Sequence, residues 1–531
     1  MQRSLRIGTC VLLLGCNFDS SGNAGGSADS VAASTAGSDG SSSSSAGGSA
    51  VTASGSSDGG SGSGSSGPVD CPPGNVGCPC DGTMCHDNLS CDNGICSTVC
   101  GNGDVEGAEQ CDPPSDGPDQ GCEADCTLSP GAAAIAVGSD HSCALLHSGA
   151  VRCWGAGDHG KTGLATLETI GDDETPDGRA DVDVGGAVLE LALGTAFSCA
   201  LRRNGQVYCW GFVDHGRLGY GPAVEEDIGD DETPATAGPL PLPANVVDLA
   251  AGGTHACAVI DDGALYCWGE GTAGKLGYGS TMNVGGNNTP IAQGQVPLGE
   301  PVVAVAAGAG HTCVVNDNAR VRCFGDSVHG ILGNGDSMQD IGDDEPASAS
   351  IEVDLGGDVR ILVAGSQHTC AVLEPGGDVT CWGFGANGRL GYGDTADVGD
   401  DESLGDLRVA LGGAAVAIDA GRAHTCALVD DGAVKCWGDG TGGKLGQGST
   451  MDLGDTEASL PTAIPAVNVD DGVGATLLGI ATGGDHSCAR LDGGRVRCWG
   501  AAADGQLGYG NPMPLGDMPG ELPAGDVAIG G

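Results

Sequence analysis

The sequence predicts an all-β repeat protein of the solenoid or propeller type. A stretch that holds two cysteines ten residues apart and ends in Trp-Gly, first seen as HSCALLHSGAVRCWG at 141–155, recurs along the chain. The chain is also rich in glycine, with 101 of 531 residues, and poor in aromatic residues at 3%. Self-similarity at a period near fifty residues is typical of solenoids and propellers, and the glycines supply tight turns.

The first fifteen residues are predicted to be a signal peptide. MQRSLR is basic, IGTCVLLL is a short apolar run, and Leu-Leu-Gly-Cys ends at Cys16. The run is too short to span a bilayer. The segment resembles a bacterial lipoprotein signal, which implies that Cys16 is lipidated and that the protein is anchored at the outer membrane or cell surface. An ordinary secretion signal is the alternative. The 26 cysteines also favour an oxidising compartment.

Residues 16–70 are almost entirely Ser, Gly, Ala and Asp, so we expect a disordered linker that holds the rest off the membrane. Residues 71–128 form a module with ten cysteines and almost no apolar core. Disulfides are favoured there, with zinc as the alternative. Its second half resembles the four-cysteine repeat of myxobacterial surface proteins, which is matched by Cys100, Cys111, Cys122 and Cys126.

Residues 129–531 carry seven cysteine pairs, whose first members lie 56 to 62 residues apart. In the first pair, the turn 147–149 ends in glycine, which suits a type I turn closed by a left-handed residue. With that turn, Cys143 and Cys153 lie directly opposite each other in a hairpin, near disulfide range. We therefore predict a disulfide across each hairpin, with buried free thiols as the alternative. The predicted pairs are Cys143 with Cys153, Cys199 with Cys209, Cys257 with Cys267, Cys313 with Cys323, Cys370 with Cys381, Cys426 with Cys436, and Cys488 with Cys498.

The flanking strands carry small or apolar groups on both faces, which suits sheets stacked around an axis. Repeat four has Ala319 where other repeats have glycine, so its turn is predicted to be strained or different. The similar ends, AAAIAVG and AGDVAIGG, predict a blade closed by both termini.

The motifs GxxHTCAL, DDGxVxCWG and GxLGxG resemble the repeat of the regulator of chromosome condensation (RCC1) family. This resemblance covers residues 131–531 and implies a seven-bladed β-propeller with four strands in each blade. Phe197 departs from the pattern, because it stands where the other repeats have histidine.

Six histidines occupy one repeated position and invite a metal-binding interpretation. Because they fall at equivalent places on different blades, we interpret them instead as structural hydrogen bonders at a strand start. They are His141, His255, His311, His368, His424 and His486.

Acidic loops follow the repeated strands and supply the candidate metal ligands. Carboxylates are hard oxygen donors suited to Ca²⁺, although no loop has the spacing of an EF-hand. Solvated turns are the alternative. The candidate ligands are Asp172, Asp173, Glu174, Asp230, Asp231, Glu232, Asp343, Asp344, Glu345, Asp400, Asp401 and Glu402.

The net charge of −51 disfavours nucleic acid and suits cationic partners. The chain has no HExxH motif, and its candidate histidines and aspartates belong to the repeat, so we predict no catalytic residue and, apart from Ca²⁺, no cofactor. The first hypothesis is a surface lipoprotein whose propeller binds a protein or glycan. The second is a guanine-nucleotide exchange factor, as the RCC1 resemblance implies. The third is an extracellular hydrolase on a propeller scaffold.

Overall fold

The computed structural model describes residues 90–92, 95–97, 131–470 and 474–530. The short strands β1 (Ser90–Asp92) and β2 (Ile95–Ser97) pair antiparallel, with Cys91 opposite Cys96. The rest of the cysteine-rich module, the signal peptide with Cys16 and the linker lie outside the described residues.

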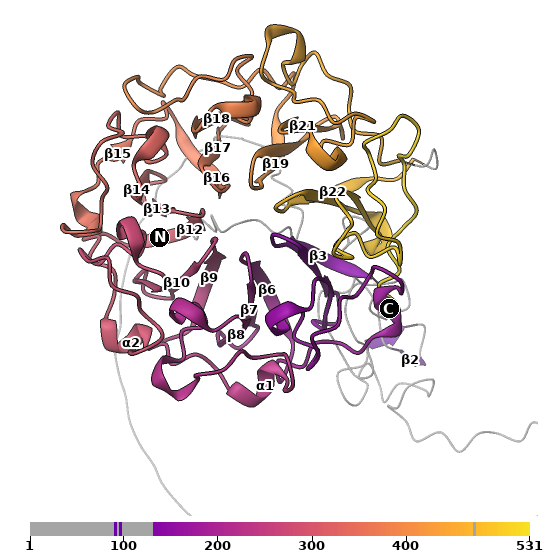
Figure 1. Cartoon of the computed structure of the whole chain (residues 1–531), viewed down its shortest axis with the longest axis horizontal. Coiled ribbons are helices and arrows are strands. Elements are labelled where there is room, and N and C mark those ends of the chain that lie inside the picture. Colours follow the sequence, from indigo (N-terminus) through magenta and orange to yellow (C-terminus); the bar gives the residue numbers. More distant parts are fainter. Residues whose placement is uncertain (1–89, 93–94, 98–130, 471–473, 531) are drawn as a thin grey trace, which may run out of the picture. The chain divides into compact units, whose positions relative to one another are not determined.

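Residues from 131 onward build seven antiparallel sheets set in a ring, each forming one blade (Figure 1). The inner strands are β3 (Ala132–Val137), β6 (Val188–Leu193), β9 (Val246–Ala251), β12 (Val302–Ala307), β16 (Asp358–Ala364), β19 (Ala415–Ala420) and β22 (Leu477–Thr482). The middle strands are β4 (His141–Leu146), β7 (Phe197–Arg202), β10 (His255–Ile260), β13 (His311–Asn316), β17 (His368–Glu374), β20 (His424–Val429) and β23 (His486–Leu491). The outer strands are β5 (Val151–Gly155), β8 (Val207–Gly211), β11 (Leu265–Gly269), β14 (Val321–Gly325), β18 (Asp378–Gly383), β21 (Val434–Gly438) and β24 (Val496–Gly500).

Short helical turns lie in the loops that follow the outer strands or connect the blades, and one forms the hairpin turn between β23 and β24. The α-helices are α1 (Pro234–Ala237) and α2 (Pro290–Gln293). The 3-10 turns are Asp158–Gly160, Pro176–Gly178, Asp214–Gly216, Gly221–Ala223, Thr272–Gly274, Val328–Gly330, Ala347–Ala349, Ala386–Gly388, Thr441–Gly443, Glu457–Ser459 and Asp492–Gly494. Within the described ranges, no helix has the length and apolar character that crossing a membrane requires.

Six blades have three strands, so the expectation of four strands per blade was wrong for them. The fourth blade adds β15 (Glu352–Val353), which pairs with β14. In the other blades a fourth segment reaches the outer strand through one backbone hydrogen bond, as when Val182 N donates to Val151 O at 2.8 Å. The end of each outer strand also forms an isolated bridge with the loop that follows it, as between Gly155 and Ile170, but in these six blades the contacts do not extend into a ladder.

The two ends of the chain do not share a blade, which corrects the expectation drawn from their similar sequences. The last blade consists of β22, β23 and β24 in succession, and the first consists of β3, β4 and β5. The ring closes where the last blade meets the first, and Gly484 N donates to Gly138 O at 3.1 Å. Each repeat therefore coincides with one complete blade.

The hairpin between the middle and outer strands has the predicted register in all seven blades. Cys143 lies opposite Cys153, and each of the fourteen cysteines of the repeats is bonded to its predicted partner, with Cα–Cα separations of 4.0 to 4.1 Å. The turn of blade one closes with Gly149 N donating to Leu146 O at 2.8 Å. Blade four keeps the same turn, and its Ala319 adopts the positive φ of 59° that glycine adopts elsewhere.

The Trp-Gly ending of each repeat serves packing between blades. All six tryptophans are fully buried, and Phe324 takes their place in blade four. Each indole N–H reaches a main-chain carbonyl of the preceding blade, as Trp210 Nε1 does to Lys161 O at 3.0 Å. Because a buried indole N–H needs an acceptor, these bonds fix how neighbouring blades stack.

Candidate functional site

The six repeated histidines lie between blades, where each one hydrogen-bonds a hydroxyl of the next blade. His141 Nε2 lies 2.9 Å from Ser198 Oγ, and that hydroxyl donates back to Lys161 O of the first blade at 3.0 Å. The other contacts are His255 with Thr312 (2.8 Å), His311 with Thr369 (2.8 Å), His368 with Thr425 (2.9 Å), His424 with Ser487 (2.9 Å) and His486 with Ser142 (2.8 Å). These contacts support the structural interpretation of the histidines.

The hydrogen bonds of this relay place a proton on Nε2 of the imidazole. Because the hydroxyl proton goes to a carbonyl, the hydroxyl accepts from Nε2–H, and Nδ1 carries the lone pair. Burial lowers the pKa of all six histidines below 6.5, to about 4 for His311 and about 3 for His424 and His486. The ring packs on backbone, since a Cβ on Gly138 would lie 2.6 Å from His141 Nδ1, which leaves no room for a metal ion.

The one blade without the histidine also lacks its partner. Phe197 replaces histidine in blade two, and the hydroxyl position of blade three is Ala256. Both residues are fully buried. An imidazole left without the hydroxyl in this layer would lose its Nε2 hydrogen bond in a site closed to water, which accounts for the joint absence of the two groups.

We expect the variants His368→Phe and Thr425→Ala to show this coupling. Thr425→Ala leaves the buried His368 Nε2–H without an acceptor and should cost about 2–3 kcal/mol of unfolding free energy. In the His368→Phe background the same change should cost about 1–2 kcal/mol less, because it recreates the natural Phe–Ala pair. Guanidinium unfolding of the four proteins measures the cycle, and additive costs would contradict the relay.

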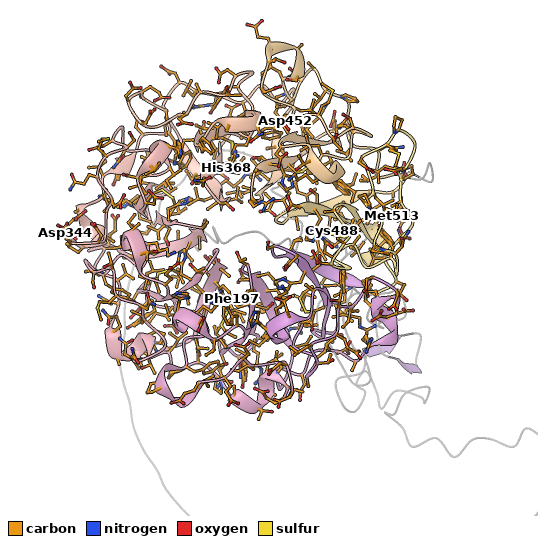
Figure 2. All side chains as sticks on the ribbon, in the orientation of Figure 1. Phe197, Asp344, His368, Asp452, Cys488 and Met513 are labelled. Carbon is orange, nitrogen blue, oxygen red and sulfur yellow. A yellow bond between two sulfur atoms is a disulfide. The ribbon has the colours of Figure 1, made fainter. Side chains whose placement is uncertain are left out.

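The acidic loops form carboxylate triads on four blades. Within each triad, one carboxylate oxygen per residue lies within 4.8 Å of the others. Figure 2 shows Asp344, from one of them, at the outer edge of the ring. The triads are Asp172, Asp173 and Glu174; Asp230, Asp231 and Glu232; Asp343, Asp344 and Glu345; and Asp400, Asp401 and Glu402. The structure therefore brings together the predicted ligands of each loop, with one triad per blade.

In three triads, the environment of the glutamate raises its pKa. Desolvation and a hydrogen bond with the neighbouring aspartate raise the pKa of Glu174, Glu232 and Glu345, to about 7 for Glu232. Both carboxyl oxygens of Glu345 are shielded from solvent. In blade one, Arg179 pairs with Glu174 at 2.7 Å and partly neutralises the triad. Converging carboxylates of this kind could hold a divalent cation.

A central cavity of about 390 Å³ is a feature that sequence reasoning missed. Mostly small and apolar residues of the inner strands line it, together with Glu190, Asp419, Arg422 and Arg490. Burial and the nearby Asp248 carboxylate raise the pKa of Glu190 well above its usual value. Arg490 lies opposite Gly479 in the sheet, which leaves space above the glycine. In the sequence, Arg490 is recognisable because it stands in HSCARL where another repeat, HSCALL, has an apolar leucine.

Consecutive antiparallel blades joined by repeated polar relays define this chain as a seven-bladed repeat β-propeller. Residues 180–519 match the family model of the RCC1-like domain, and residues 132–161 match the regulator of chromosome condensation (RCC1) repeat. The chain belongs to the RCC1-like domain family.

Similar proteins include the ultraviolet-B receptor UVR8 of Arabidopsis thaliana, which is 29% identical over 71% of this chain and 79% of its own length. The human E3 ubiquitin-protein ligase HERC2 is 30% identical over 62% of this chain but only 6% of its own length. Among solved structures, yeast RCC1 (Prp20) bound to Kap60 has a TM-score of 0.54 at 19% identity, covering 74% of this chain and 84% of that chain. Human WBSCR16 has a TM-score of 0.53 at 20% identity, covering 67% and 85%. These structures share the fold.

Proposed function

We propose that this protein is a surface-anchored lipoprotein whose disulfide-stapled propeller binds a protein or a glycan. The observation that carries the proposal is the repetition of exposed acidic loops around a ring whose blades are held rigid from within by relays, tryptophans and disulfides. A rigid scaffold that presents variable loops is a common arrangement for binding proteins. Among solved neighbours, yeast RCC1 (Prp20) is bound to Kap60.

Export and lipid anchoring rest on the Leu-Leu-Gly-Cys sequence that ends at Cys16 and on the seven hairpin disulfides. Disulfides persist in oxidising compartments. Cell fractionation with fatty-acid labelling tests this part of the proposal. We expect the wild-type chain in the membrane fraction with a labelled Cys16, and the variant Cys16→Ser unlabelled and released from the membrane. Recovery of the wild-type chain in the cytosol would overturn it.

Binding is tested by immobilising the full-length protein and capturing ligands from cell-surface extracts. Competition by purified glycans or by protease treatment of the extract separates the two ligand classes. A nucleotide-exchange assay tests the exchange-factor alternative, which the family name supports and the charge of −51 opposes. Hydrolysis of surface polymers without retention of any ligand would favour the hydrolase alternative instead.

The acidic triads support Ca²⁺ binding as a second candidate function, and the converging carboxylates with raised glutamate pKa values favour it. Ca²⁺ at a hundred times its dissociation constant should stabilise each occupied site by about 2.7 kcal/mol, and a chelator should reverse this. The variant Asp343→Asn/Glu345→Gln should lose part of the rise in melting temperature. Asn287→Ala, in the blade-three loop without a triad, is the matched control. A melting temperature indifferent to the chelator would eliminate the metal.

A further inference from the structure

Methionine is distributed unusually in this propeller. All five methionines of the described residues are exposed, and Met338 is 90% exposed. The others are Met282 (74%), Met451 (74%), Met513 (59%) and Met518 (55%). Methionine is among the residue types most often buried in proteins, and here the core is filled by other side chains. An exposed thioether contributes nothing to folding, so its repeated exposure needs another explanation.

Four of these methionines occupy one structural position in blades three, four, six and seven. At that position, a side-chain oxygen two residues earlier accepts a hydrogen bond from the backbone amide of the methionine. The contacts are Met282 N to Ser280 Oγ (3.1 Å), Met338 N to Asp336 Oδ1 (2.8 Å), Met451 N to Ser449 Oγ (3.0 Å) and Met513 N to Asn511 Oδ1 (3.1 Å). Each local turn fixes the backbone while the side chain projects into solvent. Figure 2 shows Met513 at the outer edge of the ring.

Each of these methionine loops is joined to the acidic loop of the next blade. Ser280 N, two residues before Met282, donates to Gly342 O at 3.0 Å, and Gly342 directly precedes the triad that begins at Asp343. The equivalent bonds run from Gly335 N to Gly399 O (3.0 Å), from Ser449 N to Gly516 O (3.2 Å) and from Gly510 N to Gly171 O (3.0 Å). The glycines at 399 and 171 also precede triads, and Gly516 precedes Asp517. The methionine loops and the acidic loops are thus joined through their backbones across four blade boundaries.

The combination of exposed thioethers and carboxylates favours a particular class of binding partner. A thioether offers a flexible, polarisable apolar contact that adapts to varied side chains, and carboxylates form strong hydrogen bonds with ammonium or guanidinium groups. A chain with a net charge of −51 attracts cations over a long range. We propose that the four methionine loops and their adjoining acidic loops dock polypeptide segments that carry lysine or arginine beside apolar side chains. This inference rests on the proposed binding function and narrows its ligand to a basic, amphipathic protein segment.

Because the methionine loop and its adjoining acidic loop occur four times, a partner could bind at more than one of them. A partner that offers two basic apolar segments could occupy two neighbouring loops, as at Met282 and Met338 or at Met451 and Met513, and its second contact would form at high effective concentration. Blade one has Glu168 and blade five has Ala396 at the same capped position, so the methionine sites form two adjacent pairs around the ring.

Fluorescence anisotropy with the full-length protein tests the proposal, in buffer with a chelator so that bound cations do not mask the carboxylates. The probes are a labelled lysine–leucine peptide and a lysine–serine peptide of equal length and charge. We expect the lysine–leucine peptide to bind at least about tenfold more tightly, a difference of about 1.4 kcal/mol. The variant Met282→Gln/Met338→Gln/Met451→Gln/Met513→Gln should lose that preference at an unchanged melting temperature.

The matched control is Val247→Thr/Val416→Thr, which changes two exposed apolar side chains of the inner strands β9 and β19 and should bind as the wild type does. Equal binding of both peptides, or an unchanged preference in the methionine variant, would overturn the inference. The proposed function is judged separately by fractionation and capture: a ligand retained equally by wild type and methionine variant would leave that function standing while this inference falls.

Discussion

Lowering the pH from 7 to 5.5 is expected to remove at least about 3 kcal/mol of the histidine contribution to the free energy of unfolding, about 1 kcal/mol each for His311, His424 and His486. Six buried imidazoles, at His141 and its five equivalents, remain neutral in the folded propeller because burial depresses their pKa values. In the unfolded chain each titrates near 6.5. His311, His424 and His486 then each cost roughly 1 kcal/mol at pH 5.5, since a protonated unfolded state is favoured over a neutral folded one.

The sign of this dependence follows from the direction of the shifts. The stabilisation is fully present above pH 6.5 and is lost as the pH falls toward the folded-state values, which are about 4 for His311 and about 3 for His424 and His486. Glu232 acts in the opposite sense, because its raised pKa of about 7 favours the protonated folded state. The pKa values of Glu190, Glu174 and Glu345 are also raised and act in the same sense, so the net loss of stability is smaller than the histidine contribution alone. Carboxylates with lowered pKa, such as Asp140 at about 2, add their own losses only below about pH 4.

Guanidinium unfolding at a series of pH values measures this effect. The slope of unfolding free energy against pH reports the number of protons taken up on unfolding. The variant His368→Phe/Thr425→Ala removes one imidazole and should reduce that number by one. An equal pH dependence of the wild type and this variant between pH 7 and 5.5 would show that the His368 imidazole does not remain neutral in the folded state.

Reducing the seven hairpin disulfides is expected to have the second large effect. Six of them join cysteines ten residues apart, and one joins cysteines eleven apart. Closing a loop of that length stabilises the folded state by about 3 kcal/mol in the chain-entropy model. Removing one bridge with Cys257→Ala/Cys267→Ala should therefore cost about 3 kcal/mol. Removing all seven exceeds the 5–15 kcal/mol stability typical of a domain.

Refolding from denaturant, with and without reductant, measures this prediction. The cysteine sulfurs of the repeats are almost fully buried, so the bridges have to be reduced in the unfolded chain and the fold then tested on dilution. The reduced protein should fail to regain its native near-ultraviolet circular dichroism. Mass spectrometry after alkylation of the protein unfolded without reductant supplies the decisive control, because fourteen alkylated thiols would exclude the bridges.

Sequence reasoning worked where the decisive contacts are local. The ten-residue spacing of Cys143 and Cys153 sets the register of one hairpin, and seven copies of that hairpin indicate the repeat fold. It failed for the outer edge of the blades, where the RCC1 resemblance implied a fourth strand and most segments make a single hydrogen bond. Sequence reasoning also failed to predict how the propeller ring closes. Similar sequences at the two ends of the propeller do not reveal which strand each end pairs with.

The chain by itself determined the blades: the number of repeats, the turn in each hairpin and the pairs of cysteines, because every contact involved lies within about a dozen residues. Only the tertiary structure decided what happens between blades. His368 meets Thr425 57 residues away, and Ser280, beside Met282, meets Gly342 62 residues away. Contacts between residues so far apart in the sequence leave no local sequence pattern, because they depend on how the stacked blades align their loops and strand starts. Blade stacking also determines what surrounds the carboxylate triads, the central cavity and the methionine loops.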